Sequence, residues 1–134
     1  MYQLRGKLSI VMPAYNEEAL IYNSIMQTLS IVEQFAPDME IIAVNDGSKD
    51  KTKQEIERAI GDDAKQPHRV TAGMTVSKTR VTLVTSNKNR GKGNAIIAGV
   101  SQAEGDYIAF VDADLELNPA QLEGYLKKME ESAS

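Results

Sequence analysis

Short apolar runs alternate along the chain with longer segments that have helical spacing. The apolar runs are Leu8–Met12, Glu40–Val44, Val81–Val84 and Tyr107–Val111. The segments with helical spacing lie at about 19–35, 51–60, 94–103 and 119–134. This pattern predicts four buried strands that alternate with four helices. Because strands that are apolar on both faces need helical crossovers, we expect an α/β fold with a mostly parallel, doubly wound sheet flanked by helices.

The length of the chain predicts one domain that covers residues 1–134. Segment 61–79 has no clear period and is rich in polar residues, glycine, lysine and threonine. We therefore interpret it as a long surface loop, with an irregular hairpin near 69–76. The sole histidine, His68, lies in this segment and is expected to be exposed rather than catalytic.

Composition excludes several classes of function. The formal net charge of -4 and the pI of about 5.0 argue against binding to nucleic-acid backbones. Because the chain has no cysteine, it offers no disulfide, thiolate nucleophile or cysteine zinc site, which fits a reducing compartment and a cytoplasmic location. No uncharged apolar run is long enough to span a membrane.

The loops that follow the predicted strands are the place to look for a ligand, because doubly wound sheets bind ligands beyond the carboxyl ends of their strands. These loops are 13–18, 45–52, 86–93 and 112–119.

Two carboxylates follow the last predicted strand with one residue between them. In an extended segment, Asp112 and Asp114 project to the same side and could bind one cation. Two carboxylates with water and substrate phosphates are a common way to hold Mg²⁺ or Mn²⁺, and Glu116 could add a third oxygen. The alternative is that Asp112 begins a turn and Asp114 is only solvated, because loops favour aspartate.

The loop after the second predicted strand contains another candidate ligand. Ser48 or Asp50 would cap the following helix, and Gly47 would provide a turn with unusual backbone angles. Asp46 is either a turn former or a group that accepts a hydrogen bond from a nucleobase or a ribose.

The loops at 13–18 and 86–93 offer groups for a nucleotide. Asn16 is the expected N-cap of the first helix, and Tyr15 provides either an aromatic face for a base or a packing edge. Arg90, Gly91 and Lys92 precede the third helix and suit an anion such as a diphosphate. They match neither the dinucleotide fingerprint nor the phosphate-loop motif.

Taken together, four blocks resemble family 2 glycosyltransferases, and within that family the polyprenyl-phosphate (dolichyl-phosphate) mannose and glucose synthases. The blocks are Ile10–Glu18, Val44–Thr52, Asn89–Gly99 and Val111–Leu115. The resemblance implies the Rossmann-like GT-A fold. It also implies an inverting transfer of sugar from a UDP- or GDP-sugar, with a metal that stabilises the departing diphosphate.

The resemblance also assigns roles to residues of this chain. Asp112 and Asp114 form the D-x-D motif and carry the catalytic metal, and Glu116 stands where some relatives have a further metal ligand. The residues expected at the nucleotide are Pro13, Ala14, Tyr15, Glu17, Asp46, Ser48, Arg90, Gly91 and Lys92. The implied acceptor is a polyprenyl phosphate, which would place the protein at the membrane surface.

Members of this family continue well beyond the D-x-D helix, into the part that carries the acceptor site. We therefore expect either a fragment with a truncated sheet or a short module that binds nucleotide sugar without transferring it. Apolar surface left exposed by such a sheet could favour a homo-oligomer. A nucleotidyltransferase is a third alternative, although residues 13–16 do not resemble its activation loop.

Overall fold

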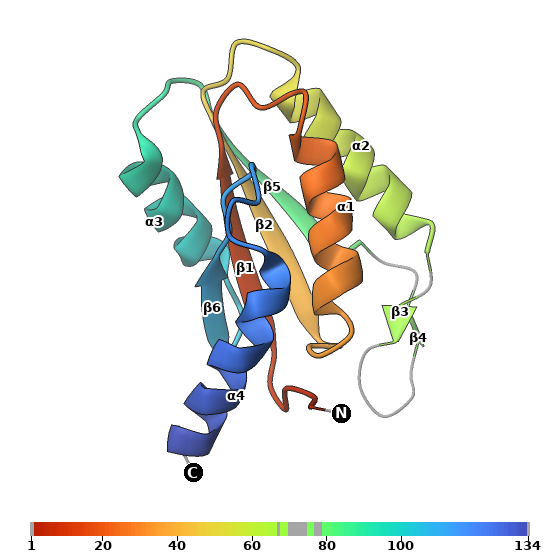
Figure 1. Ribbon diagram of the computed structural model, residues 1–134. Helices are drawn as coiled ribbons and strands as arrows, with labels where there is room; N and C mark the ends of the chain where they lie inside the picture. Colours follow the sequence, from red (N-terminus) through yellow and green to blue (C-terminus); the bar gives the residue numbers. More distant parts are fainter. Residues whose placement is uncertain (1, 67, 70–74, 77–78, 134) are drawn as a thin grey trace.

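The computed structural model describes residues 2–66, 68–69, 75–76 and 79–133, and four parallel strands form the centre of the protein (Figure 1). The strands are β1 (Leu8–Ala14), β2 (Met39–Asp46), β5 (Val81–Ser86) and β6 (Tyr107–Phe110). Their order across the sheet is β5-β2-β1-β6, with all neighbours parallel. The predicted parallel α/β sheet is confirmed, and three of the strands extend further toward their carboxyl ends than the apolar runs alone indicated.

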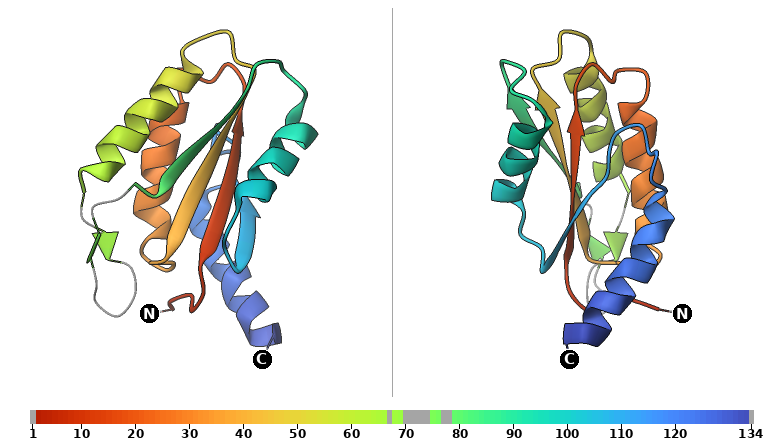
Figure 2. Two further views of the ribbon diagram at one scale, coloured as in Figure 1. Left: turned by 180° about the vertical axis from the view of Figure 1, so that it is seen from behind. Right: turned by 60° about the vertical axis from the view of Figure 1, so that its left-hand side comes forward.

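Helices cover both faces of the sheet (Figure 2). The helices are α1 (Ile21–Val32), α2 (Thr52–Ala64), α3 (Lys92–Gln102) and α4 (Leu122–Ala133), the last preceded by the 3-10 turn η1 (Pro119–Gln121). One face is covered by α3, and the opposite face by α1, α2 and α4. No helix in the described part of the chain is long and apolar enough to cross a membrane.

The segment expected to be a long loop is partly regular. Residues 61–64 belong to the last turn of α2, because Asp63 on its inner face is buried and continues the helical pattern of Ile56 and Ala59. The expected hairpin is present as β3 (His68–Arg69) and β4 (Thr75–Val76), which pair antiparallel. The side chain of His68 lies outside the part that the structure describes.

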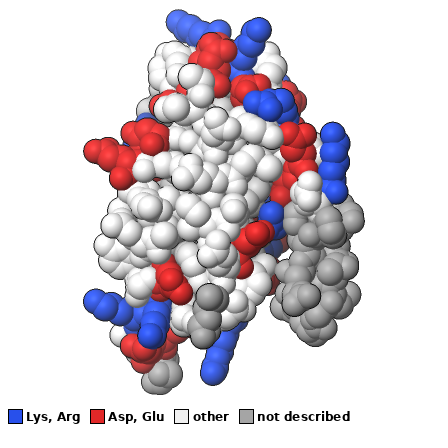
Figure 3. Space-filling model, turned by 45° about the vertical axis from the view of Figure 1, so that its right-hand side comes forward, with Lys and Arg blue, Asp and Glu red and all other residues white. Residues whose placement is uncertain are grey.

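The larger core lies between the sheet and α1, α2 and α4. It contains fully buried side chains from β1 and β2, such as Ile10 and Ile41, packed against Ile25 of α1 and Ile56 of α2. No residue of α1 is charged, and a broad central part of the face shown in Figure 3 carries no charged side chain. Ile21, Ile25, Leu29 and Val32 of α1 are buried, so the apolar positions of the first predicted helix account for its docking on the sheet.

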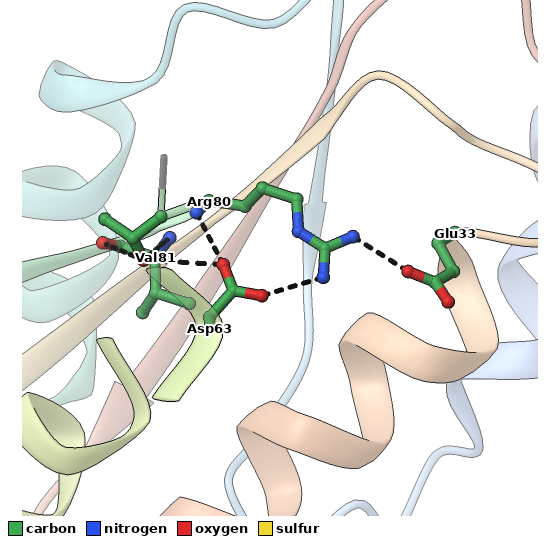
Figure 4. A network of polar contacts seen from close by, with 5 residues as sticks. Glu33, Asp63, Arg80 and Val81 are labelled. Carbon is green, nitrogen blue, oxygen red and sulfur yellow. Dashed lines mark hydrogen bonds and ion pairs between the residues drawn. The ribbon is translucent and has the colours of Figure 1, made fainter. Parts of the chain in front are cut away.

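A network of ion pairs around the buried Asp63 lies at the edge of the sheet opposite the strand-end loops (Figure 4). Asp63 is 1% exposed, and its carboxylate accepts hydrogen bonds from the backbone N–H of Arg80 at 2.7 Å and from Nη2 of Arg80 at 2.8 Å. Nη1 of Arg80 donates to Glu33 at the end of α1 at 2.9 Å. Arg80 thereby joins the ends of α1 and α2 to the start of β5.

The smaller core holds α3 close to the sheet through a glycine. A Cβ on Gly99 would lie 2.4 Å from Cγ1 of Val11 and 3.1 Å from Cγ2 of Val44. Both neighbours are buried, β-branched side chains, which have little rotamer freedom with which to yield. The backbone of α3 therefore packs directly on β1 and β2 at Gly99.

We predict opposite effects of Gly-to-Ala changes in α3 and α4. Gly124 of α4 has no atom within 4 Å of an added Cβ, so Gly124→Ala should stabilise the protein by about 0.5–1 kcal/mol through helix propensity alone. Gly99→Ala gains the same propensity but must displace Val11, and it should destabilise the protein by about 1–2 kcal/mol net. Urea unfolding of both variants measures the difference. Equal stabilisation by the two changes would contradict the close packing of α3.

Candidate active site

A cleft of about 360 Å³ opens at the carboxyl edge of the sheet, among the loops that follow the four strands. The loops after β1, β2 and β5 lie at the top of Figure 1, and the loop after β6 lies below them. The cleft is lined by Pro13, Ala14, Tyr15, Glu17, Asp46, Asn89, Gly91, Lys92, Ala95, Asp112, Ala113 and Asp114. All four strand ends therefore contribute to a single cavity.

Hydrogen bonds join the loop after β1 to the loop after β2. The backbone N–H of Asn16 donates to Oγ of Ser48, and Oδ1 of Asn16 accepts from the backbone N–H of Lys49, each at 2.9 Å. Asn16 is therefore not the N-cap of α1, which begins at Ile21. Its φ of 53° turns the chain between Tyr15 and the helix, and its side chain is used by the neighbouring loop.

Asp50 strengthens the same junction. Its carboxylate accepts from the backbone N–H of Thr52 at 2.9 Å and of Glu18 at 3.2 Å, and also from Oγ1 of Thr52. Burial alone would raise the pKa of Asp50, but these hydrogen bonds outweigh it and lower the pKa. Of the two expected caps of α2, Asp50 thus accepts a hydrogen bond from the first turn of the helix, whereas Ser48 accepts one from the backbone N–H of Asn16.

Asp46 holds the loop before α3. It is 5% exposed, and its two carboxylate oxygens accept from the backbone N–H groups of Arg90 at 2.9 Å and of Gly91 at 3.0 Å. Gly47 makes this approach possible, because an added Cβ would lie 2.2 Å from the backbone nitrogen of Asn89. As predicted, Gly47 has an unusual angle, with φ of 69°.

The segment after β6 presents two carboxylates at the cleft. Asp112 and Asp114 are exposed, whereas Ala113 between them is 3% exposed and packs into the core. The carbonyl of Ala113 accepts a hydrogen bond from the buried hydroxyl of Ser24 in α1. This hydrogen bond attaches the segment to α1 on its buried side, and both aspartates lie on its solvent-exposed side.

Lys92 pairs with the first of these carboxylates. Nζ of Lys92 lies 2.8 Å from Oδ1 of Asp112, and both side chains are about half exposed or more, at 61% and 48%. The hydrogen bond and charge of Asp112, with a further contribution from Asp114, raise the pKa of Lys92. One cation of the protein therefore already lies between the loop before α3 and the D-x-D segment.

The donors at the cleft suit a hard divalent cation. Asp112 and Asp114 offer oxygen ligands on an open wall, and Mg²⁺ or Mn²⁺ bound by two carboxylates keeps water and phosphate oxygens as its remaining ligands. Within the described ranges, no group of three or more His, Cys, Asp or Glu residues could hold a metal by itself.

The expected third ligand, Glu116, is exposed and does not line the cleft. The chain turns after Asp114, whose Oδ1 accepts from the backbone N–H of Glu116 at 3.0 Å. The structure therefore does not bring Glu116 together with the two aspartates.

Nine of the residues expected from the sequence line the cleft, and three do not. Ser48 accepts a hydrogen bond from the loop after β1, and Arg90 lines a separate hollow beside α3. Glu116 is not among the residues that line the cleft. Asn89, Ala95 and Ala113 are additional lining residues. Asn89 lies in the loop 86–93, which the sequence already indicated as a place for a ligand. The hydrogen bond of Ser24 to Ala113 could not be predicted, because a serine within a helix carries no signal of such a contact.

Known proteins share this sequence pattern over nearly the whole chain. An undecaprenyl-phosphate 4-deoxy-4-formamido-L-arabinose transferase from Photorhabdus laumondii subsp. laumondii is 33% identical over 125 residues, which cover 93% of this chain and 34% of the relative. The enzyme of the same name from Proteus mirabilis is 30% identical over 126 residues, or 94% of this chain and 34% of the relative. The chain thus spans about one third of the length of these relatives.

Solved structures share the fold. A mannosyltransferase from Pyrobaculum calidifontis, in complex with GDP-Man and Mn²⁺, superposes with a TM-score of 0.73 at 23% identity, over 92% of this chain and 32% of that one. TarS 1-349 from S. aureus, in complex with UDP, gives a TM-score of 0.65 at 25% identity, over 93% of this chain and 32% of that one.

The family match extends over all four strand-end loops. The profile described as "Glycosyl transferase family 2" matches residues 9–134, which include all of the four-stranded sheet except Leu8, together with the cleft and α4. This chain belongs to glycosyl transferase family 2.

Proposed function

We propose that this chain binds a UDP- or GDP-sugar together with Mg²⁺ or Mn²⁺, and that the whole protein transfers the sugar, with inversion, to a polyprenyl phosphate. The observation that carries the proposal is the shared cleft, in which the buried Asp46 and the exposed pair Asp112 and Asp114 line one cavity. A nucleotide sugar needs both a polar site for its base and ribose and a counter-charge for its diphosphate.

Each wall of the cleft suits one part of such a ligand. Tyr15 is 40% exposed and offers an aromatic face for the base. Asp46 retains acceptor capacity, because each carboxylate oxygen has two lone pairs and each receives one backbone N–H. Next to Asp46, the N-terminus of α3 and Lys92 provide N–H groups and a positive charge for the diphosphate.

The metal is assigned to Asp112 and Asp114 because both carboxylates are exposed and line the cleft, where Asp112 also pairs with Lys92. When bound there, a divalent cation would neutralise the charge that develops on the departing nucleoside diphosphate. The Pyrobaculum mannosyltransferase was solved with Mn²⁺, but its likeness supports the fold alone, so the assignment depends on the two aspartates of this chain.

The acceptor is proposed from the relatives. The named transferases from Photorhabdus and Proteus act on undecaprenyl phosphate, which is a polyprenyl phosphate. A lipid phosphate is already a nucleophile and needs no strong general base in the cleft. Because such an acceptor lies in a membrane, the protein would associate peripherally with the cytoplasmic face of that membrane.

Turnover distinguishes a transferase from a module that only binds nucleotide sugar. The assay uses the whole protein. It measures release of UDP or GDP from candidate sugar nucleotides in the presence of undecaprenyl phosphate and Mn²⁺. Release that depends on the lipid phosphate supports transfer. Tight binding without release supports the non-catalytic module, and absence of binding to any nucleoside diphosphate contradicts both.

We predict that Asp114→Asn weakens nucleotide binding only when metal is present. The amide keeps an oxygen for the backbone N–H of Glu116 but loses the charge that the metal needs, so the affinity for UDP or GDP should fall about tenfold or more with Mn²⁺. Calorimetric titration with and without Mn²⁺ measures this. Glu116→Gln is the matched control and should change affinity less than about twofold. A metal-dependent affinity that survives Asp114→Asn would exclude the proposed ligand.

We predict that Asp46→Asn weakens nucleotide binding with and without metal. An amide has one oxygen for the N–H groups of Arg90 and Gly91, so the loop before α3 loses a hydrogen bond and about 1 kcal/mol of stability, because the N–H of Gly91 retains Oδ1 of Asn89 as an acceptor. Asp106→Asn is a control at the opposite edge of the sheet, where one exposed carboxylate accepts from the N–H of Lys7. Thermal unfolding and titration with UDP and GDP compare the two. Equal effects of both changes would argue against the special role of Asp46.

A further inference from the structure

The ion pair between Lys92 and Asp112 bears on the order in which ligands bind. Both residues line the cleft, and Nζ of Lys92 lies 2.8 Å from Oδ1 of Asp112. Asp112 is one of the two carboxylates assigned to the metal. The carboxylate that the metal requires is therefore already neutralised by a cation of the protein.

The position of Lys92 is fixed by its backbone rather than by its side chain. Lys92 is the first residue of α3 and follows Gly91, whose φ is 93° and whose N–H donates to Asp46 at 3.0 Å. The side chain itself is 61% exposed and packs into no core. Its long stem can therefore turn from Asp112 to another anion in the cleft while its backbone stays in place.

The ion pair is weak enough to exchange. Pairs that are half exposed contribute little to stability, because water screens them and ordering the long lysine side chain has an entropic cost. A divalent cation on Asp112 would nevertheless repel the neighbouring ammonium group through like charge. Metal alone and Lys92 thus compete for one carboxylate, and a diphosphate in the cleft would relieve the competition by offering the ammonium a new partner.

On the basis of the proposed function, we propose that Lys92 couples metal binding to diphosphate binding: it holds Asp112 before the nucleotide arrives, and it releases Asp112 to the metal when it moves to the diphosphate. Lys92 is thus a positioning residue that makes the two ligands bind cooperatively. Because such coupling is reciprocal, the metal must strengthen nucleotide binding by the same factor by which the nucleotide strengthens metal binding.

The test measures binding of Mn²⁺ alone, and of UDP and GDP with and without Mn²⁺, to the whole 134-residue chain. For Lys92→Met, Mn²⁺ alone should bind roughly three- to tenfold more tightly than to the parent, since the competing charge is gone. The factor by which Mn²⁺ strengthens nucleotide binding should fall by a similar amount. Electron paramagnetic resonance of free Mn²⁺ gives the first quantity and calorimetry the second.

Two variants control for charge. Lys92→Arg retains a cation at the same position and should resemble the parent. Lys49→Met removes the same charge from an exposed lysine in the loop after β2, which forms no ion pair within the described part of the chain, and it should leave the coupling factor within about twofold of the parent. Circular dichroism verifies that each variant is folded.

The outcomes separate this inference from the proposed function. The inference is overturned if Lys92→Met binds Mn²⁺ no more tightly than the parent, or, where Mn²⁺ alone is too weak to measure, if its coupling factor equals that of the parent. The proposed function would survive that result if the parent still bound the nucleotide with Mn²⁺ and if Asp114→Asn still weakened this binding. Failure of the parent to bind either nucleotide with Mn²⁺ would instead contradict the proposed function itself.

Discussion

Parallel pairing of the strands is the constraint on which the site depends. Because every pair in the four-stranded sheet is parallel, all four carboxyl ends point to the same edge of that sheet. The register makes them level: Ala14 lies opposite Asn45, and Asn45 lies opposite Thr85. The last strand, β6, ends at Phe110 opposite Val11, and Asp112 follows two residues later. Residues from distant parts of the sequence meet there without a separate binding domain.

Hydrogen bonds between the loops convert this shared edge into a defined cleft. Asn16, Ser48 and Asp50 fasten the loop after β1 to the loop after β2. Asp46 then fastens the loop after β2 to the loop before α3. The helix α3 also packs closely on the sheet at Gly99, beside Val11 and Val44. The geometry of the cleft is therefore a property of the backbone network as well as of the lining side chains.

The fold and most of the candidate site could be predicted from the sequence, because apolar runs and strand-end polar residues report directly on a parallel sheet. Long-range hydrogen bonds could not be predicted in this way. Local pattern favours Asn16 as a helix cap, whereas the structure uses it between loops. Similarly, the spacing of Glu116 from Asp114 suggests a third ligand, but a turn after Asp114 removes Glu116 from the cleft. Pairing of Lys92 with Asp112 depends on two loops meeting, which no local motif encodes.

The central claim is that a divalent cation and a nucleoside diphosphate bind together at the carboxyl edge of the sheet, and paramagnetic broadening by Mn²⁺ tests it most directly. In NMR spectra recorded with UDP or GDP, small amounts of Mn²⁺ should selectively broaden the backbone amide signals of residues 112–116, 89–93 and 14–17. Signals of the acidic surface of α4, around Glu130, should remain sharp. Broadening centred on α4, or spread evenly over all acidic residues, would contradict the account.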